Sequence, residues 1–259
     1  MSWKLKQQQE YEYLYMPEFD STGMVVHGIT TRSCGDMSPA GGKDNYQHMA
    51  STLFQSDPST IFVCRQIHGN NIYKPEKRCV YPPEADALIT NRKGITLSIF
   101  TADCLPIFIL DPENGAIGLV HAGWRGTMSR IVQRTMEEMG KAYQTNPSSC
   151  LAGIGPGICG KCYEVGLPVV EYMLAEFKGF THFLQQKGRR HSGKGSISIN
   201  GKNLLNLSSL NKQQMLEAGV LEKNISVCEY CTAENNSLLY SYRMEGENAG
   251  RMMSVLSLR

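Results

Sequence analysis

Residues 101–127 constrain the fold of this chain more than any other stretch. Two short, continuously apolar runs, Leu105–Leu110 and Ala116–Val120, flank the turn-forming sequence Asp-Pro-Glu-Asn-Gly. This pattern predicts two buried strands joined as an antiparallel hairpin. In such a hairpin Cys104, just before the first run, lies beside His121, just after the second, so a thiol and an imidazole can share a ligand.

A third candidate ligand, His68, follows a strand predicted at Ile61–Ile67. Two histidines and one cysteine, with a fourth position open to water, form the donor set of a catalytic zinc site. His68 and Cys104 are 36 residues apart and Cys104 and His121 are 17 apart, so only the fold can bring them together. Spacing alone leaves open both a metal site and the alternative that these are packed core residues.

Apolar periodicity and turn signals predict the rest of the fold, and we expect one domain spanning residues 1–259. Further strands are predicted at Val25–Thr30, Ala85–Thr90, Ile95–Phe100, Leu151–Ile154, Ile225–Cys228, Leu238–Arg243 and Met252–Leu258. Helices are predicted at Met128–Met139, Pro168–Phe177 and Leu207–Ala218.

The composition narrows the class of protein. With 41% hydrophobic residues among 259, the chain can bury a sizeable core. A net charge of +2 favours neither nucleic acid nor an anionic membrane, so we expect a small-molecule partner. The N-terminal segment lacks the apolar stretch of a signal peptide, and no apolar run reaches the ~18 residues of a transmembrane helix, which predicts a cytoplasmic protein.

The nine cysteines are an odd number and indicate reduced thiols rather than a disulfide framework. Two Cys-x-x-Cys pairs, Cys159/Cys162 and Cys228/Cys231, raise the alternative of a structural zinc site. A zinc ribbon usually has roughly 15 to 20 residues between its pairs. Because 66 positions separate Cys162 from Cys228, the sequence argues against a four-cysteine site.

A glycine-rich segment at 188–194, GRRHSGK, imitates a phosphate-binding loop. Gly195 stands where a Ser or Thr must reach magnesium, and no apolar strand leads directly into the segment. We therefore expect an exposed, mobile loop within residues 178–202.

Three polar side chains are candidates for binding an anion or a sugar. Arg32 and Asn45 lie in a Gly-, Ser- and Pro-rich segment, where a solvated loop is the alternative. Arg125 lies near the N-terminus of the helix predicted at Met128–Met139, and unpaired backbone N–H groups at a helix start favour an anion.

Short motifs spread along nearly the whole chain form one set: His27–Arg32, Gln66–Gly69, Ala85–Ala87, Thr101–Pro106, His121–Thr127, Cys162–Gly166, Cys231–Thr232 and Ser241–Arg243. Together they resemble the YfiH-like family, long labelled polyphenol oxidases or laccase-domain proteins and now regarded as purine nucleoside phosphorylases with adenosine deaminase activity. The resemblance implies an α+β fold of mixed β-sheets in a layered α/β/β/α sandwich with helices outside. It places the family's zinc ligands on His68, Cys104 and His121.

By this resemblance we expect a monomeric enzyme, a transferase and hydrolase, that acts on small-molecule nucleosides and phosphate. Phosphorolysis of adenosine, inosine or guanosine-type nucleosides would release the free base and ribose 1-phosphate, and adenosine would also be deaminated. The candidate catalytic residues are Cys104, Asp103, Arg125 and Glu164. The candidates for binding substrate and phosphate are Arg32, Asn45 and Arg125. Asp103 or Glu164 would act as general acid/base or orient a ligand histidine.

Composition argues against the laccase label. A multicopper oxidase fills a mononuclear His₂Cys site and a histidine-rich trinuclear cluster, and the chain has only six histidines. We therefore expect zinc rather than copper, since zinc lowers the pKa of bound water toward ~7 and supplies a nucleophile for the amino-bearing carbon of adenine. The alternatives are a polyphenol oxidase, a cysteine hydrolase using Cys104 and His121, and a non-enzymatic zinc-dependent binding module.

Overall fold

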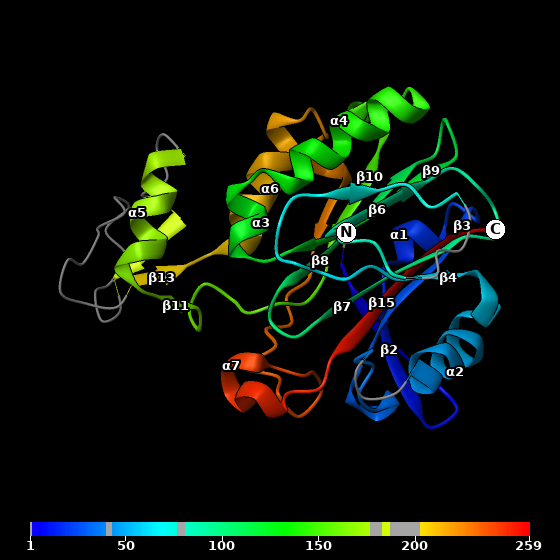
Figure 1. The fold of residues 1–259 in the computed structure, drawn as a ribbon, viewed down its shortest axis with the longest axis horizontal. Helices are drawn as coiled ribbons and strands as arrows, with labels where there is room; N and C mark the ends of the chain where they lie inside the picture. Colours follow the sequence, from blue (N-terminus) through cyan, green and yellow to red (C-terminus); the bar gives the residue numbers. More distant parts are fainter. Residues whose placement is uncertain (1, 40–42, 77–80, 177–182, 187–202) are drawn as a thin grey trace.

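Four layers, in the order helix, sheet, sheet, helix, make up the body of the fold (Figure 1). The structure is a computed structural model that describes residues 2–39, 43–76, 81–176, 183–186 and 203–259. Two six-stranded sheets lie at the centre and a three-stranded sheet lies at one end. These mixed sheets with outer helices confirm the fold class expected from the sequence.

The first sheet joins the two ends of the chain. Its strands, in spatial order, are β1 (Lys4–Gln8), β2 (Tyr11–Tyr15), β3 (Val25–Thr30), β15 (Met252–Leu258), β7 (Thr96–Thr101) and β4 (Ile61–Phe62). All neighbours pair antiparallel except β4, which runs parallel to β7.

The second sheet carries the predicted hairpin at its centre. Its strands, in spatial order, are β14 (Ile225–Val227), β10 (Leu151–Ile154), β8 (Leu105–Asp111), β9 (Ala116–Ala122), β6 (Ala87–Thr90) and β5 (Ile72–Tyr73). The hairpin β8–β9 is antiparallel, with Pro106 opposite His121. This register puts Cys104, directly before β8, and His121, in β9, at the same end of the sheet, as the sequence predicted.

Helices cover the outer faces of both sheets. Over the second sheet lie α3 (Trp124–Met128), α4 (Ile131–Tyr143) and α6 (Leu207–Glu217), and over the first lies α2 (Lys43–Phe54) (Figure 1). The short helices α1 (Pro17–Asp20) and α7 (Tyr242–Glu245) flank the sheets. Single 3₁₀ turns occupy Arg32–Cys34, Pro58–Thr60, Pro147–Ser149, Glu222–Asn224 and Gly246–Asn248.

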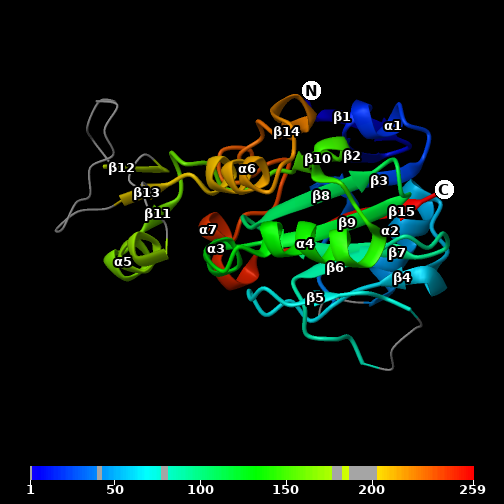
Figure 2. The ribbon, with the colours of Figure 1, turned by 90° about the horizontal axis from the view of Figure 1, so that it is seen from above.

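The third sheet extends from one end of the body. It consists of β11 (Glu164–Val165), β13 (Asn203–Leu205) and β12 (Leu184–Gln186), accompanied by α5 (Leu167–Glu176). Both views show this group on the side away from α2 and the chain termini (Figure 1 and Figure 2). The expected loop at 178–202 and its phosphate-loop imitation at 188–194 lie almost entirely outside the described residues.

Three apolar clusters hold the layers together. The one between the two large sheets contains fully buried side chains from both, including Leu97, Phe108 and Leu256. A second joins the hairpin sheet to α4 and α6, and a third joins the first sheet to α2. Each large side chain buried in this way stabilises the fold by about 1.5–3 kcal/mol through the hydrophobic effect.

Three predicted elements differ from the structure. The helix expected from Met128 is broken at Arg130, whose φ of 58° is left-handed, so α3 and α4 are separate. The strand expected at Ile61–Ile67 shortens to Ile61–Phe62. The strand expected at Leu238–Arg243 is wrong: Ser241 caps α7 by accepting the Met244 N–H. Among the described residues no helix is long and apolar enough to cross a membrane.

Candidate metal centre

His68, Cys104 and His121 meet at the end of the hairpin. One ligand atom from each lies within 4.8 Å of the others, and the two imidazole rings are edge to face with centroids 4.8 Å apart. His121 is buried, Cys104 is half-buried and His68 is exposed. Three converging donors with one exposed side match an open, thiophilic metal site, so this donor set fits zinc.

Asp86, directly before β6, holds this group together. Its Oδ1 lies 2.8 Å from Nδ1 of His121, and its carboxylate accepts the backbone N–H groups of Ile67, His68 and Gly69. Because Nδ1 of His121 faces Asp86, Nε2 is the nitrogen left for a metal. We expected Asp103 or Glu164 to act as general acid/base or to orient a ligand histidine; at His121 the orienting carboxylate is Asp86.

The loop that carries His68 is fixed on its other side by an amide. The Gln66 side chain donates to the carbonyl of Phe100 and accepts its N–H, both at 2.8 Å. His68 and Asp103 have positive φ values, 57° and 82°. Such conformations cost about 1–3 kcal/mol and occur at functional sites, where the surrounding contacts impose them.

Gly123 makes the close approach of the donors possible. A Cβ atom at Gly123 would lie 3.0 Å from Sγ of Cys104 and 3.2 Å from Cδ2 of His68. Such distances are tighter than ordinary van der Waals contact. A side chain here would therefore push two of the three donors apart.

The protonation of Cys104 and His121 is coupled. Burial alone would raise the pKa of the Cys104 thiol, but the His121 and His68 imidazoles lower it to about 6. Burial alone would lower the pKa of His121, but the Cys104 thiolate and the Asp86 carboxylate raise it to about 9. The cysteine is thus a thiolate near neutral pH, the form that binds metal.

Asp103 lies next to Cys104 but faces another set of partners. Its carboxylate accepts the hydroxyls of Thr232 at 2.5 Å and Ser241 at 2.8 Å, and the N–H of Arg243 at 2.6 Å. These contacts join α7 and the segment after β14 to the residue that precedes the candidate metal ligand Cys104. The Asp103 carboxylate thus has three hydrogen-bond donors from two other segments.

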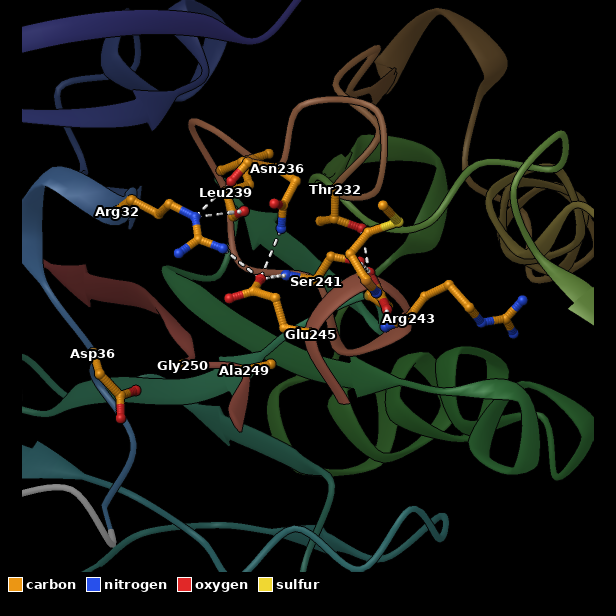
Figure 3. Close-up of polar contacts among 12 residues, drawn as sticks. Arg32, Asp36, Thr232, Asn236, Leu239, Ser241, Arg243, Glu245, Ala249 and Gly250 are labelled. Atoms are coloured by element: carbon orange, nitrogen blue, oxygen red, sulfur yellow. Dashed lines mark hydrogen bonds and ion pairs between the residues drawn. The ribbon is translucent and has the colours of Figure 1, made fainter. Parts of the chain in front are cut away.

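The pKa of the Tyr163 hydroxyl is influenced by several ionisable groups around the candidate metal centre. Burial raises its pKa to about 12; Cys104 and Asp103 act in the same direction, while Arg243 and Arg125 oppose them. The Arg243 guanidinium lies 5.3 Å from the centre of the Tyr163 ring. In Figure 3 this guanidinium points away from Glu245 and α7.

Arg125, in α3, presents its guanidinium 4.4 Å from the centre of the Trp124 ring. The side chain is exposed. It makes no hydrogen bond or ion pair with any other residue that the structure describes. With respect to the described residues, its donors are therefore free to meet a ligand.

Arg32, by contrast, is committed to protein acceptors. Its Nε donates to the carbonyls of Asn236, at 2.5 Å, and Leu239, at 3.2 Å. Its Nη2 pairs with Glu245, and the guanidinium stacks 4.2 Å from the Tyr240 ring centre. Figure 3 shows the side chain directed into this loop, so Arg32 ties the segment after β3 to the segment before α7.

The two remaining candidates, Asn45 and Glu164, each have a described hydrogen bond that involves a backbone carbonyl. Asn45 lies in the first turn of α2 and donates to the carbonyl of Asp36 at 2.7 Å. Glu164 opens β11, and its carbonyl accepts from Arg243 at 3.0 Å. The residues that sequence reasoning left without a role are Asp86, Tyr163 and Arg243; for Asp86 the available signal was a lone acid inside the apolar run Ala85–Ile89.

Known proteins share both fold and sequence with this chain. A family model described as multi-copper polyphenol oxidoreductase laccase matches residues 28–259. A purine nucleoside phosphorylase of Deinococcus radiodurans is 37% identical over 249 residues, 90% of this chain and 89% of the relative. Adenosine deaminase RL5, from an unknown prokaryotic organism, is 36% identical over 166 residues, 64% of this chain and 59% of the relative. The crystal structure of YlmD from Geobacillus stearothermophilus has a TM-score of 0.84 at 26% identity, covering 98% of each chain.

The layered sandwich and the His₂Cys donor group define a class of α+β proteins with one open candidate metal site on the edge of a hairpin. Within that class, the chain belongs to the multi-copper polyphenol oxidoreductase laccase family. The resemblance to YfiH-like proteins is thereby confirmed.

Proposed function

We propose that this protein is a zinc enzyme of purine nucleosides. It cleaves adenosine, inosine and guanosine-type nucleosides with phosphate to free base and ribose 1-phosphate, and it deaminates adenosine. The observation that carries the proposal is the convergence of His68, Cys104 and His121 around one point. The names of the relatives, a purine nucleoside phosphorylase and an adenosine deaminase, support both reactions.

Zinc fits the donor group better than a multicopper set does. Copper oxidases need a histidine-rich cluster beside their His₂Cys site. In the described part of the chain, His68 and His121 are the histidines that gather with other ligands, whereas His27 is buried against Phe19 and Phe108 and His48 is exposed on α2. Bound at the His₂Cys group, zinc would supply a Lewis acid.

The chain's own residues supply orientation and charge. Asp86 holds His121 and the His68 backbone, and Gly123 lets the thiol approach them. Arg125 is the phosphate-binding candidate because its guanidinium fork is exposed and can take two phosphate oxygens at once. We do not assign phosphate to Arg32, because its Nε and Nη2 are already bound to protein acceptors.

Substrate turnover tests the proposal directly. Purified protein is incubated with adenosine or inosine, with and without inorganic phosphate, and the bases, nucleosides and ribose 1-phosphate are separated. We expect base release only with phosphate, and inosine from adenosine under both conditions. Equally fast base release without phosphate indicates a hydrolase, and inosine as the only product leaves a deaminase. Oxidation of phenols with no action on nucleosides overturns the proposal.

A cysteine hydrolase is the second candidate, favoured by one observation. The neighbouring imidazoles lower the pKa of Cys104 to about 6, and Asp86 holds the His121 ring. Cys104, His121 and Asp86 thus correspond to the nucleophile, base and acid of a catalytic triad. The two candidates differ at His68, which only a metal site requires. Metal-free protein that turns over substrate through a covalent adduct on Cys104, and that tolerates His68→Ala, identifies the hydrolase.

A further inference from the structure

A second group of three thiols lies outside the site described above. The Sγ atoms of Cys159, Cys162 and Cys231 all lie within 4.8 Å of one another, and all three cysteines are free thiols. The sequence separation argued against a site built from both Cys-x-x-Cys pairs, yet the fold unites three of those four residues. The fourth, Cys228, instead packs against the apolar cluster between the sheets.

Strand pairing explains this convergence. β10 and β14 run parallel, and the pairing continues as a bridge between Gly157 and Cys231, where the Thr232 N–H donates to the Gly157 carbonyl at 3.1 Å. The segment after β10 therefore lies beside the segment after β14. Cys162 and Cys228 are 66 positions apart in the sequence, but the pairing of β10 with β14 brings the segments that follow these strands together.

The Cys159–Cys162 turn completes the group. The N–H groups of Cys162 and Tyr163 both donate to the Cys159 carbonyl, at 3.0 and 2.9 Å, which folds the two thiols of the pair toward the same side. The Cys159 N–H donates to Sγ of Cys231 at 3.3 Å. This contact holds the Cys231 sulfur beside the backbone of the Cys159–Cys162 turn.

A carboxylate stands beside the thiols. Oε1 of Glu234 lies 3.7 Å from Sγ of Cys162, and the Glu234 side chain is exposed. Glu234 lies outside the group of ligand atoms within 4.8 Å of one another, so its side chain would have to change rotamer to reach an ion shared by the thiols. The group thus offers three sulfur donors and one oxygen donor.

We propose that Cys159, Cys162 and Cys231 bind a second zinc ion as thiolates, with the Glu234 carboxylate as fourth ligand. Tetrahedral zinc with Zn–S bonds of about 2.3 Å holds its sulfur atoms roughly 3.8 Å apart, a spacing within the 4.8 Å limit of the cluster. A disulfide would use only two thiols at about 2.05 Å and leave the third without a role. The oxygen donor favours zinc over Cu(I), which prefers purely soft ligands.

This ion is structural, because four protein ligands close its coordination shell. It would hold in place the segments that contact the residues around the first metal centre. Thr232, next to Cys231, donates to Asp103, and Arg243 donates to the Cys162 carbonyl at 3.4 Å. The second site does not depend on the nucleoside chemistry, since none of its ligands belongs to the His68 group.

Zinc content of the full-length protein tests the second site. The protein is purified anaerobically without chelators, and zinc per chain is measured by elemental analysis. We expect about two zinc ions in the wild type and about one in the double variant His68→Ala/His121→Ala, because the thiol site remains. Adding Cys231→Ser should remove the remaining ion. Adding Cys228→Ser instead, a nearby cysteine outside the cluster, should leave it in place.

A measurement on unaltered protein covers the case in which a cysteine variant does not fold. Wild-type protein loaded with cadmium should give two cadmium NMR resonances, one of them at the shift typical of several thiolate ligands. Absence of the thiolate-type resonance, no zinc in the double histidine variant, or copper in place of zinc would overturn the proposal. So would a Cys159–Cys162 disulfide, seen as the loss of two hydrogens in the mass of the anaerobic protein. A lone thiolate-type resonance would count only against the His68 group.

Discussion

Oδ1 of Asp86 lies 2.8 Å from Nδ1 of His121 and also accepts the backbone N–H of His68 at 2.9 Å. One fully buried carboxylate therefore positions two of the three candidate metal ligands, one through its ring and one through its backbone. The turn into β6 therefore supports the candidate metal site although it supplies none of the three ligands.

Replacing Asp86 with Asn should weaken zinc binding at the His68 group by about 10- to 100-fold, the usual cost of losing such an outer carboxylate. The neutral amide cannot stabilise the His121 ring as the carboxylate does. Competition with a zinc chelator measures the affinity, and a thermal melt confirms that the variant is folded. The control is Asp111→Asn, another fully buried aspartate, which caps the β8–β9 turn. An equal loss in both variants would contradict a specific role for Asp86.

Gly123→Ala should disturb the metal centre while leaving the fold intact. The added Cβ would meet Sγ of Cys104 at 3.0 Å and Cδ2 of His68 at 3.2 Å, so we expect at least about a tenfold loss of zinc affinity, similar to other disturbances of ligand geometry. The control is Gly140→Ala in α4, where the nearest atom would be 3.6 Å away. That variant should bind zinc normally and gain about 0.5–1 kcal/mol from helix propensity. Normal zinc binding by Gly123→Ala would show that the donors can separate without cost.

The hairpin could be predicted because its signals are local. Continuous apolar runs and a Pro-Glu-Asn-Gly turn determine β8 and β9, and the two-residue period of strands then places Cys104 near His121. The strand predicted at Leu238–Arg243 failed because Ser241 caps a helix turn there. A Ser side chain can cap a helix by accepting a backbone N–H group that follows it, or it can lie in a strand. Tertiary contacts determine which of these two structures forms.

The rest of the site depends on contacts between distant segments. Arg32 looked available for an anion, but Glu245, 213 residues later, engages it. The Cys159, Cys162 and Cys231 group was missed because sequence separation says nothing about the pairing of β10 with β14. Asp86 had a visible signal, an acid in an apolar run, but its partner is defined only once β6 lies beside β9.

Asp103→Asn should keep zinc at the His68 group and lower the rate of nucleoside turnover by at least about tenfold, the usual minimum for a general acid or base. The carboxylate touches no metal-ligand side chain but accepts from Thr232, Ser241 and Arg243. Steady-state kinetics at several pH values measure the change in turnover rate. The control is Asp57→Asn, which alters an exposed aspartate that caps the 3₁₀ turn Pro58–Thr60. Unchanged turnover would remove Asp103 from the mechanism, whereas a lower rate with one limb of the pH profile lost would identify proton transfer.

Acid should destabilise the protein through His27, which is 3% exposed. Burial lowers its pKa from 6.5 to about 4, with Asp20 opposing the shift. Between these two pH values the unfolded chain binds a proton at His27 more readily than the folded chain does. The free energy of unfolding is therefore unaffected by His27 above pH 6.5 and decreases as the pH drops toward 4. The full contribution is about 3 kcal/mol, at about 1.36 kcal/mol per pH unit.

Urea unfolding of His27→Gln at pH 7 and pH 4.5 checks this expectation. The variant should lose less stability between the two pH values than the wild type does, because Gln carries no titrating group and can still accept the Met16 N–H that His27 accepts at 2.9 Å. The exposed His48→Gln should keep the wild-type pH dependence. Parallel curves for wild type and His27→Gln would show that other groups control the acid limb.

Arg125→Lys should separate the two proposed reactions. Lysine keeps the positive charge but cannot take two phosphate oxygens with one planar fork, so phosphorolysis should lose at least about tenfold in kcat/KM for phosphate, or about 1.4 kcal/mol. Deamination of adenosine uses no phosphate, so its rate should change much less. Both rates are measured on the same adenosine sample by separating adenine from inosine. The matched control is Arg134→Lys, an exposed arginine on α4, which should change neither rate. Equal losses in both reactions would mean that Arg125 supports the nucleoside or the fold rather than the phosphate.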